Sequence, residues 1–448
     1  MTFTEETICA VATPPGTGGI GVIRVSGPSA FAVVDAVSRR PKCASGHGHT
    51  LYRNVILAAD GSVLDDVLLA IFRAPRSYTG EDVVEVSAHG SPLILGQILA
   101  RLLASGARLA RPGEFTQRAF LNGKMDLAQA EAVSDLITAQ TAQAQRLARL
   151  QSEGRLSRAV TGIRSQILGV LAQIEASIDF PEEVGELNTE QCEAELDEAQ
   201  TQIANLLATA DQGIITREGL SVVLAGCPNV GKSSLLNALL RSSRAIVTAV
   251  PGTTRDVLEE TLNLNGVPLR LSDTAGLRET DDEVERIGVA RTRDTIAAAD
   301  LVLLVLDAVT GETPEDAALR QSLANRPSLV IWNKWDLQQG LPLPDGGVAV
   351  SALSGWNLDV LEAAITQKTL GNAGGTESGL VTHARHKQAL EAAFAQITDA
   401  AKSLHSGLPA DFASIDLRGA LNSLGTITGE TAAEDVIAEM FSRFCIGK

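Results

Sequence analysis

Up to about residue 120, the chain alternates short apolar runs with glycine and proline. The runs Gly19–Ser26, Val67–Phe72 and Val83–Val86 are rich in valine and isoleucine, and turn-forming sequences such as Pro14-Pro15-Gly16 separate them. Short β-branched runs between turn-forming residues are typical of strands. The pattern therefore predicts a mixed α/β domain in this part of the chain.

From Met125 the apolar residues take on the spacing of helices. One set falls three or four residues apart and predicts a helix that Phe180-Pro181 ends. A second predicted helix ends before Gly213, and helical spacing returns after residue 378. The apolar positions are Leu156, Val160, Ile163, Ile167, Leu171, Ile174 and Ile178 in the first helix, Leu196, Ala199, Ile203, Leu206 and Leu207 in the second, and Leu390, Phe394, Ile397, Val436, Ile437, Met440 and Phe441 in the last part.

Between these helical parts, from Gly219, the pattern changes to short apolar strands. Ser221–Ala225, Leu301–Leu306 and Leu329–Trp332 alternate with helical stretches, which indicates βαβ units and a mostly parallel sheet. Asn372–Ser378 has the glycine-rich composition of a linker. We therefore predict an α/β domain inserted into a helical one.

Composition narrows the class of protein. The 448 residues include 37 Lys and Arg against 54 Asp and Glu, a net charge of −17, and such a surface repels polyanions. The longest strongly apolar run, Leu301–Leu306, is too short to span a bilayer, and Glu5 and Glu6 stand where a signal peptide carries positive charge. We expect a soluble, cytoplasmic protein with no membrane segment. The cysteines lack the CxxC spacing of a zinc ribbon and indicate no disulfide framework: Cys9, Cys43, Cys192, Cys227 and Cys445.

Gly226–Ser233 fits the pattern GxxxxGK[ST], directly after a predicted strand and before the helix-like run Leu235–Leu240. Glycines in this motif let backbone N–H groups surround phosphates, and the helix N-terminus adds positive potential. Lys232 would reach the β/γ-phosphate oxygens, and the Ser233 hydroxyl would coordinate magnesium. The residues predicted to line this site are Asn229, Val230, Gly231, Lys232, Ser233 and Ser234.

Three further motifs follow predicted strands in order. Asp273 can hold magnesium through water, and the Gly276 N–H can sense the γ-phosphate. Asp336 can accept two hydrogen bonds from guanine that adenine cannot donate, which opposes an ATPase. Together with the P-loop they predict a guanine-nucleotide domain. The motifs are Asp273-Thr274-Ala275-Gly276, Asn333-Lys334-Trp335-Asp336, and the base-binding loop Ser351, Ala352 and Leu353.

The residues between these motifs bear on hydrolysis. Thr254 is a natural second magnesium ligand on a switch loop. Arg255 has two interpretations, an internal arginine finger or a solvated loop charge. Leu277 stands where many small GTPases carry a water-orienting glutamine, so another group must act or hydrolysis is slow.

Two other groups are candidates for that task. Asn229 and the carbonyl-rich loop Thr248–Thr253 can enclose a monovalent cation, which would place positive charge where an arginine finger does. The acidic stretch Glu279–Glu285 offers a carboxylate to orient water, although such a run is also typical of a solvated face.

The ordered motifs resemble the MnmE (TrmE) family of tRNA modification GTPases over essentially the whole chain. An internal GTPase domain joined to a terminal FCIGK is the most specific part of this resemblance. The similar segments are ATPPGTGGIGVIRVSG (12–27), SYTGEDVVEVSAHG (77–90), RPGEFTQRAFLNGKMDLAQAEAV (111–133), GxPNxGKSS (226–234), GTTRD (252–256), DTAGLRETDDEVERIG (273–288), NKxD (333–336) and FCIGK (444–448).

The resemblance implies an architecture of three parts. An α/β tetrahydrofolate-binding and dimerisation domain would occupy residues 1–119. A helical bundle domain would occupy residues 120–214 and 372–448, with a P-loop Ras-like G domain inserted at 215–371. Fold class is thus expected to combine α/β and all-α domains.

The resemblance also implies an activity. A potassium-dependent GTPase, working as a homodimer with the FAD- and NADH-using flavoprotein MnmG (GidA) in a heterotetramer or larger complex, would add a (carboxymethyl)aminomethyl group to carbon 5 of the wobble uridine in certain tRNAs. The 5-formyl or methylene form of tetrahydrofolate would supply the one-carbon unit, and hydrolysis would accompany G-domain dimerisation. Because the chain is acidic, we expect tRNA to be held mainly through the complex. A regulatory GTPase switch is the alternative that the G motifs alone leave open.

Site residues are carried over by motif. Glu285 would orient the attacking water, and Cys445 is either a thiolate nucleophile or a packed thiol. Arg24, inside an apolar run, would contact folate, although an arginine on a solvent-facing side of a strand is the plainer interpretation. Cys227 stands at a phosphate-loop position that is commonly arginine in the family. Ala249 and Pro251, in the switch loop, also differ from the family pattern. The implied sets are Asn229, Thr248, Val250 and Thr253 for potassium, Ser233 and Thr254 for magnesium, Arg24, Glu85, Lys124 and Lys448 for folate, and Thr248, Ala249, Val250, Pro251, Gly252, Thr253 and Thr254 around the nucleotide.

Overall fold

The structure is a computed structural model of the chain. Its contacts form two compact units, one of residues 1–134, 151–187 and 406–448 and the other of residues 135–150 and 188–405. The residues that it describes are 6–185, 187–242, 260–264, 266–273, 296, 298–338, 346–370 and 379–447.

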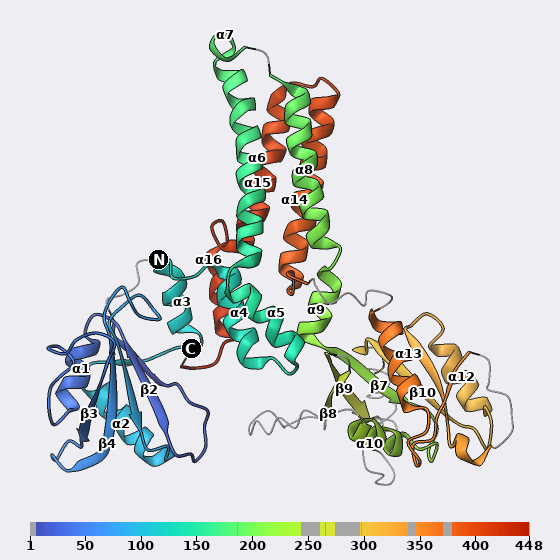
Figure 1. The fold of residues 1–448 in the computed structure, drawn as a ribbon, viewed down its shortest axis with the longest axis horizontal. Helices are drawn as coiled ribbons and strands as arrows, with labels where there is room; N and C mark the ends of the chain where they lie inside the picture. Colours follow the sequence, from blue (N-terminus) through green and yellow to red (C-terminus); the bar gives the residue numbers. More distant parts are fainter. Residues whose placement is uncertain are drawn as a thin grey trace. The chain divides into compact units, whose positions relative to one another are not determined.

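The first unit contains a six-stranded sheet with the strand order β3-β4-β5-β2-β1-β6 (Figure 1). Neighbouring strands are antiparallel except β1 and β6. Alternate residues of a strand point to opposite faces, and one face packs on two helices. The elements are β1 (Ile8–Val11), β2 (Gly21–Ser26), α1 (Ala30–Val37), β3 (Thr50–Leu57), β4 (Val63–Phe72), β5 (Val83–Ala88), α2 (Pro92–Ala104) and β6 (Arg108–Leu109).

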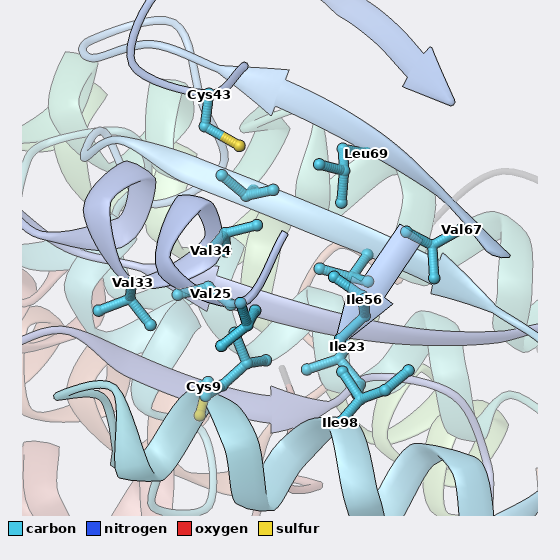
Figure 2. Close-up of a cluster of buried hydrophobic side chains, with 14 of the residues drawn as sticks. Cys9, Ile23, Val25, Val33, Val34, Cys43, Ile56, Val67, Leu69 and Ile98 are labelled. Atoms are coloured by element: carbon cyan, nitrogen blue, oxygen red, sulfur yellow. The ribbon is translucent and has the colours of Figure 1, made fainter. Parts of the chain in front are cut away.

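The two faces of this sheet carry different side chains. The core on the helix side includes Cys9, Ile23 and Ile98, and Figure 2 shows Ile23 close to Ile98. On the other face, Ile8 packs with Phe115 of α3 (Glu114–Leu121). A helix thus covers the β1 end of that face.

Long helices complete the first unit. Six of the seven apolar positions predicted for the first helix are buried in α6 (Arg155–Asp179), and only Ile178, at its end, is exposed. This confirms the predicted helix face. The other helices are the larger part of α4 (Leu127–Thr138), and α7 (Pro181–Val184), α15 (Ala410–Thr428) and α16 (Glu434–Ser442).

The second unit has its own helices and one departure from the predicted pattern. The predicted second helix ends at Leu207, but α9 (Ala210–Glu218) follows at once and runs through Gly213. A side chain at Gly213 would collide with the carbonyl of Val381, so this glycine serves close packing within a helix. The other helices are α5 (Ala142–Ser152), α8 (Thr189–Leu207) and α14 (Ala384–His405).

A second six-stranded sheet, with the order β12-β11-β10-β7-β9-β8, lies between α9 and α14 in the chain. Its pairs are parallel except β8 with β9, as the strand–helix alternation predicts. Residues Leu301–Leu306 are buried on both faces, which explains their unbroken apolar run. The elements are β7 (Leu220–Ala225), α10 (Lys232–Ser242), β8 (Glu260–Leu264), β9 (Val267–Asp273), β10 (Leu301–Asp307), α12 (Pro314–Ser322), β11 (Ser328–Asn333), the 3-10 helix η1 (Trp335–Leu337), β12 (Val348–Ala349) and α13 (Leu358–Leu370).

All five cysteines are free thiols. In the described part of the chain, no helix combines the length and apolar character that a bilayer span needs. The predicted linker, residues 372–378, lies outside the described residues.

Candidate functional site

The P-loop connects β7 to α10, and its backbone demands glycine at two places. Gly226 has φ 142° and Gly231 has φ 95°, a region that L side chains rarely adopt. A Cβ at Gly226 would meet the carbonyl of Val305, and one at Gly231 would meet the Asn333 amide. Asn229 adopts the left-handed conformation with φ 65°, so the turn is tight throughout.

Lys232 begins α10 and is nearly buried. Its Nζ donates hydrogen bonds to the carbonyls of Gly226 and Cys227, each 2.9 Å long. Ser233 and Ser234 follow on the first turn of α10 and are exposed. The ammonium group and the two hydroxyls therefore lie beside the loop at the positive end of the helix.

Asn333 joins the phosphate segment to the base-binding loop. Its side chain is buried, and its Nδ2 donates to the Val230 carbonyl at 2.9 Å while its Oδ1 accepts the Ala352 N–H at 3.0 Å. Lys334, with φ 63°, donates from Nζ to the Asn229 carbonyl at 2.8 Å. The structure thus brings together three segments far apart in the sequence.

The remaining base-site residues line the same edge of the sheet. The Trp335 N–H donates to the Val350 carbonyl at 3.1 Å, which places η1, with Asp336, beside the loop. Ser351 is fully buried and its Oγ accepts the Ser354 N–H at 3.2 Å, whereas the Leu353 side chain is 91% exposed and available to a ligand.

Part of the predicted site lies outside the described residues. Asp273 ends β9, and only its backbone position is described. Of the predicted cation ligands, Ser233 and Asn229 are described. The predicted residues outside the described part are Thr248, Ala249, Val250, Pro251, Gly252, Thr253, Thr254, Arg255, Thr274, Ala275, Gly276, Leu277, Glu285 and Lys448.

Asp307 is a site residue that motif reasoning missed. Its Oδ2 accepts a hydrogen bond from Lys334 Nζ at 2.7 Å, and its Oδ1 accepts the Val309 N–H at 2.9 Å. Burial alone would raise the pKa of Asp307, but Lys334 and the backbone donors outweigh it and hold this pKa below its usual value. The available signal was an acid directly after the apolar strand Leu301–Leu306, at the carboxyl edge where parallel sheets bind ligands.

Cys227 lies against the first turn of α12. Its Sγ is 3.9 Å from Thr313 Oγ1 and 3.7 Å from Glu315 Oε2. Burial and a hydrogen bond with Asp316 raise the pKa of Cys227 to about 11. Its thiol is therefore protonated at neutral pH and is a poor nucleophile.

A second cluster of predicted residues lies on the α3 face of the first sheet. Arg24 and Glu85 are direct partners across β2 and β5, and the Arg24 Nη2 is 2.8 Å from Glu85 Oε1. The guanidinium carbon is 5.1 Å from the centre of the Tyr78 ring and 5.6 Å from that of Phe115. The Arg24 side chain is 12% exposed, so the solvent-facing interpretation is wrong. Tyr78 and Phe115 were missed because only the tertiary fold brings them here.

The C-terminal segment completes this cluster. Arg24 Nη1 lies 3.5 Å from the Gly447 carbonyl, and the Gly113 N–H donates to the Cys445 carbonyl at 3.3 Å. Cys445 is exposed. Lys124 is also exposed, and its Nζ donates to the Pro75 carbonyl at 3.0 Å, on the loop that leads to Tyr78.

Fold and nucleotide site together define the class of protein. A parallel sheet whose strand β7 leads through a P-loop into α10, with Asn333, Lys334 and Asp336 after a later strand, is the arrangement of a P-loop GTPase domain.

Comparison with known proteins gives the family. Residues 127–445 match the MnmE helical domain, and residues 7–124 match the GTP-binding protein TrmE N-terminus. The protein called tRNA modification GTPase MnmE in Moorella thermoacetica is 47% identical, over 99% of this chain and 100% of the relative. Proteins of that name are 47% identical in Heliobacterium modesticaldum, over 99% of both chains, and 48% identical in Chloroflexus aurantiacus, over 99% and 100%. The chain belongs to the MnmE family, and the predicted combination of folds is confirmed.

Proposed function

We propose that this chain hydrolyses GTP within a complex that adds a (carboxymethyl)aminomethyl group to carbon 5 of the wobble uridine in certain tRNAs. GTP hydrolysis in tRNA modification is the activity of the family to which the chain belongs. One observation carries the nucleotide site: Asn333 bonds to both Val230 and Ala352, so the phosphate and base segments form a single site.

Each residue of this site has a role in the proposal. Backbone N–H groups of the P-loop and Lys232 would bind the phosphates, and Asp336 would select guanine. Magnesium neutralises phosphate charge when bound with the nucleotide, and Ser233 and Thr254 would hold it. The exposure of Ser233 at the start of α10 supports that fit.

Hydrolysis would depend on potassium and on G-domain dimerisation. Asn229, whose backbone is left-handed, would bind the cation together with Thr248, Val250 and Thr253. Glu285 would orient the attacking water. With a bound cation and Glu285 in these two roles, the chain would hydrolyse GTP although leucine stands at position 277.

The Arg24–Glu85 cluster would bind the 5-formyl or methylene form of tetrahydrofolate, with Lys124 and Lys448. A charged pair flanked by two aromatic rings suits a flat, polar ring system. The ion pair with Glu85 by itself accounts for the burial of Arg24, so a binding experiment distinguishes a folate site from a purely structural pair. Retention on immobilised 5-formyltetrahydrofolate, lost in Arg24→Gln, is the expected result, and equal retention of both proteins would reject the site.

The chain would act in the cytoplasm as a homodimer with the flavoprotein MnmG, which uses FAD and NADH, in a heterotetramer or larger complex. Leu51 and Leu68, on β3 and β4, are 68% and 48% exposed, and exposed apolar side chains on a sheet face support a protein contact. With a net charge of −17, the chain would hold tRNA mainly through the complex.

The experiment that tests the proposal is GTP turnover in matched potassium and sodium buffers across a range of protein concentrations. We expect a rise specific to potassium that grows with protein concentration, since the active species is a dimer. Turnover indifferent to the cation would reject the potassium site and direct the search to Arg255 or to the partner.

A further inference from the structure

Two stretches of the first unit carry basic side chains and no acidic ones. Residues 36–59 and 67–80 contain five arginines and one lysine but no aspartate or glutamate, although the whole chain has a net charge of −17. Four of these cations are exposed, and Lys124, which contacts the second stretch, is exposed as well. We call these five residues the basic band: Arg39, Arg40, Lys42, Arg76 and Lys124.

The loop between α1 and β3 carries the first three members of the band. The Arg39 N–H donates to the Val55 carbonyl at 2.9 Å, and Asn54 Nδ2 donates to the Arg40 carbonyl at 2.7 Å. Both contacts fix the loop on β3. Cys43, from the same loop, is buried in the core that Figure 2 shows. The first part of the band therefore stands on a fixed backbone.

Arg73 joins this loop to the connection between β4 and β5. Its Nη2 donates to the carbonyls of Ala44 at 2.8 Å and Gly46 at 2.7 Å, and its guanidinium carbon lies 4.7 Å from the centre of the Phe31 ring. Arg76 follows on the same connection, where its N–H donates to the Arg73 carbonyl at 2.8 Å. Arg73 thus binds the protein itself and brings the two parts of the band together.

Lys124 places the band beside the Arg24 cluster. Its Nζ donates to the Pro75 carbonyl at 3.0 Å, one residue before Arg76. Tyr78, two residues after Arg76, packs with its ring centre 5.1 Å from the Arg24 guanidinium carbon. The band therefore extends from the cluster proposed to bind the one-carbon donor to β3, the edge strand of the sheet.

The members of the band differ from several exposed arginines elsewhere in having no acidic partner. Arg320, Arg418 and Arg443 each pair with a glutamate. Among the residues that the structure describes, no member of the band forms an ion pair with a carboxylate. The positive charge of the band is therefore available to a ligand.

Carboxylates on neighbouring segments do not cancel this charge at the surface. They are half-buried, and each accepts hydrogen bonds from the protein. The donors are the N–H groups of residues 42–44 for Asp35, the Ala74 N–H for Asp82, the Gln129 N–H for Asp126, and the side chains of Arg118 and Ser26 for Glu81. Since the five cations are exposed, solvent meets a positive surface here.

This chemistry suits a phosphodiester backbone. Three of the five members are arginines, whose guanidinium groups match the geometry of phosphate oxygens. Groups held on a fixed backbone lose less conformational entropy when they bind. An anionic lipid surface has a similar charge, but the position of the band favours RNA. The proposed reaction brings the wobble uridine to the one-carbon unit at the Arg24 cluster, so phosphates of the anticodon loop must approach the neighbouring surface.

We propose that the basic band binds the phosphate backbone of the tRNA beside the wobble uridine and so directs the uridine to the Arg24 cluster. This inference rests on the proposed function, which supplies the tRNA. Contacts with phosphates fix register and orientation and carry little sequence information. Five cations make a small contact, which agrees with the flavoprotein partner supplying most of the affinity.

The test measures binding of fluorescently labelled tRNA from the same organism to the complex of the full-length protein with the flavoprotein. Anisotropy gives Kd at several KCl concentrations. Arg39→Gln with Arg40→Gln and Arg76→Gln should weaken binding roughly tenfold at about 0.15 M KCl and reduce the slope of log Kd against log salt by about 2.

The matched control is Arg320→Gln with Arg418→Gln and Arg443→Gln, which removes the same charge from arginines that are 47%, 65% and 76% exposed. Its Kd should stay within twofold of wild type. GTP turnover of the isolated protein, retention on immobilised 5-formyltetrahydrofolate and co-elution with the flavoprotein should match wild type in both triple variants.

Each other outcome overturns the band as an RNA contact. Equal weakening in both triple variants would show an effect of net charge alone. Unchanged tRNA binding in the band variant, with a wild-type complex that binds tRNA, would reject the band and leave the proposed function standing. Lost retention on folate would assign the band to the folate tail, and lost co-elution would assign it to the protein interface. A wild-type complex that does not bind tRNA would overturn the proposed function as well.

Discussion

The nucleotide site and the Arg24 cluster are both built around a basic side chain, yet they are assembled differently. In the P-loop, Lys232 Nζ donates to the carbonyls of Gly226 and Cys227, and Gly226 and Gly231 make the turn, all within one short segment. Around Arg24 the partners are a carboxylate, two aromatic rings and a carbonyl from four other parts of the chain. The P-loop part of the nucleotide site is a local backbone structure, whereas the whole Arg24 cluster exists only through the tertiary fold.

Because of this difference, substitutions at the two sites should differ in their effects on ligand affinity and on the stability of the fold. Lys232 Nζ donates to two carbonyls of the loop that follows β7, which places the ammonium group beside the P-loop backbone. Arg24 already has a counter-ion in Glu85, and removal of either leaves a charge in a poorly hydrated place. Changes at the first site should therefore alter affinity, and changes at the second should also alter stability.

Lys232→Ala should have the largest effect on binding. Loss of two charge-assisted hydrogen bonds to phosphate, at about 1.5 kcal/mol each, predicts roughly 100-fold weaker GTP binding. Fluorescent-nucleotide titration measures the affinity, with Lys368→Ala on α13 as a control for general loss of charge. Nearly normal affinity in Lys232→Ala would contradict the assignment of the loop.

Arg24→Met should destabilise the protein by about 2 kcal/mol, between the values for buried and exposed ion pairs. The cause is the unpaired Glu85 carboxylate, so Arg24→Met with Glu85→Leu should recover much of the loss. Urea unfolding of the three variants gives the double-mutant cycle. Additive losses of unfolding free energy would mean that Arg24 and Glu85 do not interact. GTP affinity should be unchanged in all three variants.

Asp307→Ala should raise the KM for GTP about tenfold, about 1.4 kcal/mol, while kcat stays within twofold. Asp307 accepts a hydrogen bond from Lys334, and in the proposed site Lys334 would act on binding and not on the reacting phosphate. The KM of Asp307→Asn should lie between those of wild type and Asp307→Ala, because asparagine keeps a hydrogen-bond acceptor but has no charge. A fall in kcat at unchanged KM would place Asp307 in the chemical step instead.

Glu114→Gln tests whether charge stabilises the fold around Arg24. Burial would raise the pKa of Glu114, but Arg108, 2.6 Å away, and the Arg111 N–H outweigh it and lower that pKa. Since the folded pKa lies below the unfolded value of about 4.3, this stabilisation is present above that pH and is lost as pH falls through the folded pKa.

The unfolding free energy of wild type should therefore exceed that of Glu114→Gln by about 1 kcal/mol at pH 7. This difference should shrink as pH falls below about 4. Hydrogen exchange across α3 measures the local stability. A gap that stays constant down to pH 3 would show that the carboxylate charge is irrelevant.

Cys227→Ser should have the smallest effect, less than twofold on GTP affinity and turnover. The thiol, with its pKa raised to about 11 by burial, contributes no charge to the P-loop. Alkylation at pH 7.5 should label the exposed Cys445 and spare Cys227. Rapid labelling of Cys227 would mean that the thiol is far more acidic than its surroundings imply.

The same contrast explains what could be predicted from sequence. The P-loop and the strands of the second sheet were predictable because motif spacing and unbroken apolar runs are local signals. The left-handed backbone of Lys334 and its contact with Asp307 were not, since this contact joins two strand ends. Helix α9 was missed because Gly213 suggests a break, whereas the helix needs glycine there for the carbonyl of Val381.

The β8–β9 hairpin was also absent from the prediction, although Asn265-Gly266 is a hairpin turn signal. For the Arg24 cluster, the resemblance supplied Arg24 and Glu85, and no local pattern could have supplied Tyr78, Phe115 or the carbonyl of Gly447. Sequence reasoning thus succeeds where one segment builds the site and depends on tertiary structure elsewhere.

The packing of the C-terminal segment against β1 affects the order in which the two sites can form during synthesis. Gly447, with φ 97°, packs so closely on Val11 that a Cβ would lie 2.5 Å from the Val11 carbonyl. Arg24 and Gly447 are 423 residues apart in the sequence, which at 5–20 residues per second corresponds to roughly 20–80 s of synthesis. The P-loop segment leaves the ribosome long before Gly447 does. A chain interrupted upstream of Phe444 would carry every nucleotide motif and an Arg24 cluster open on one side, so this cluster can form only after the nucleotide motifs have been synthesised.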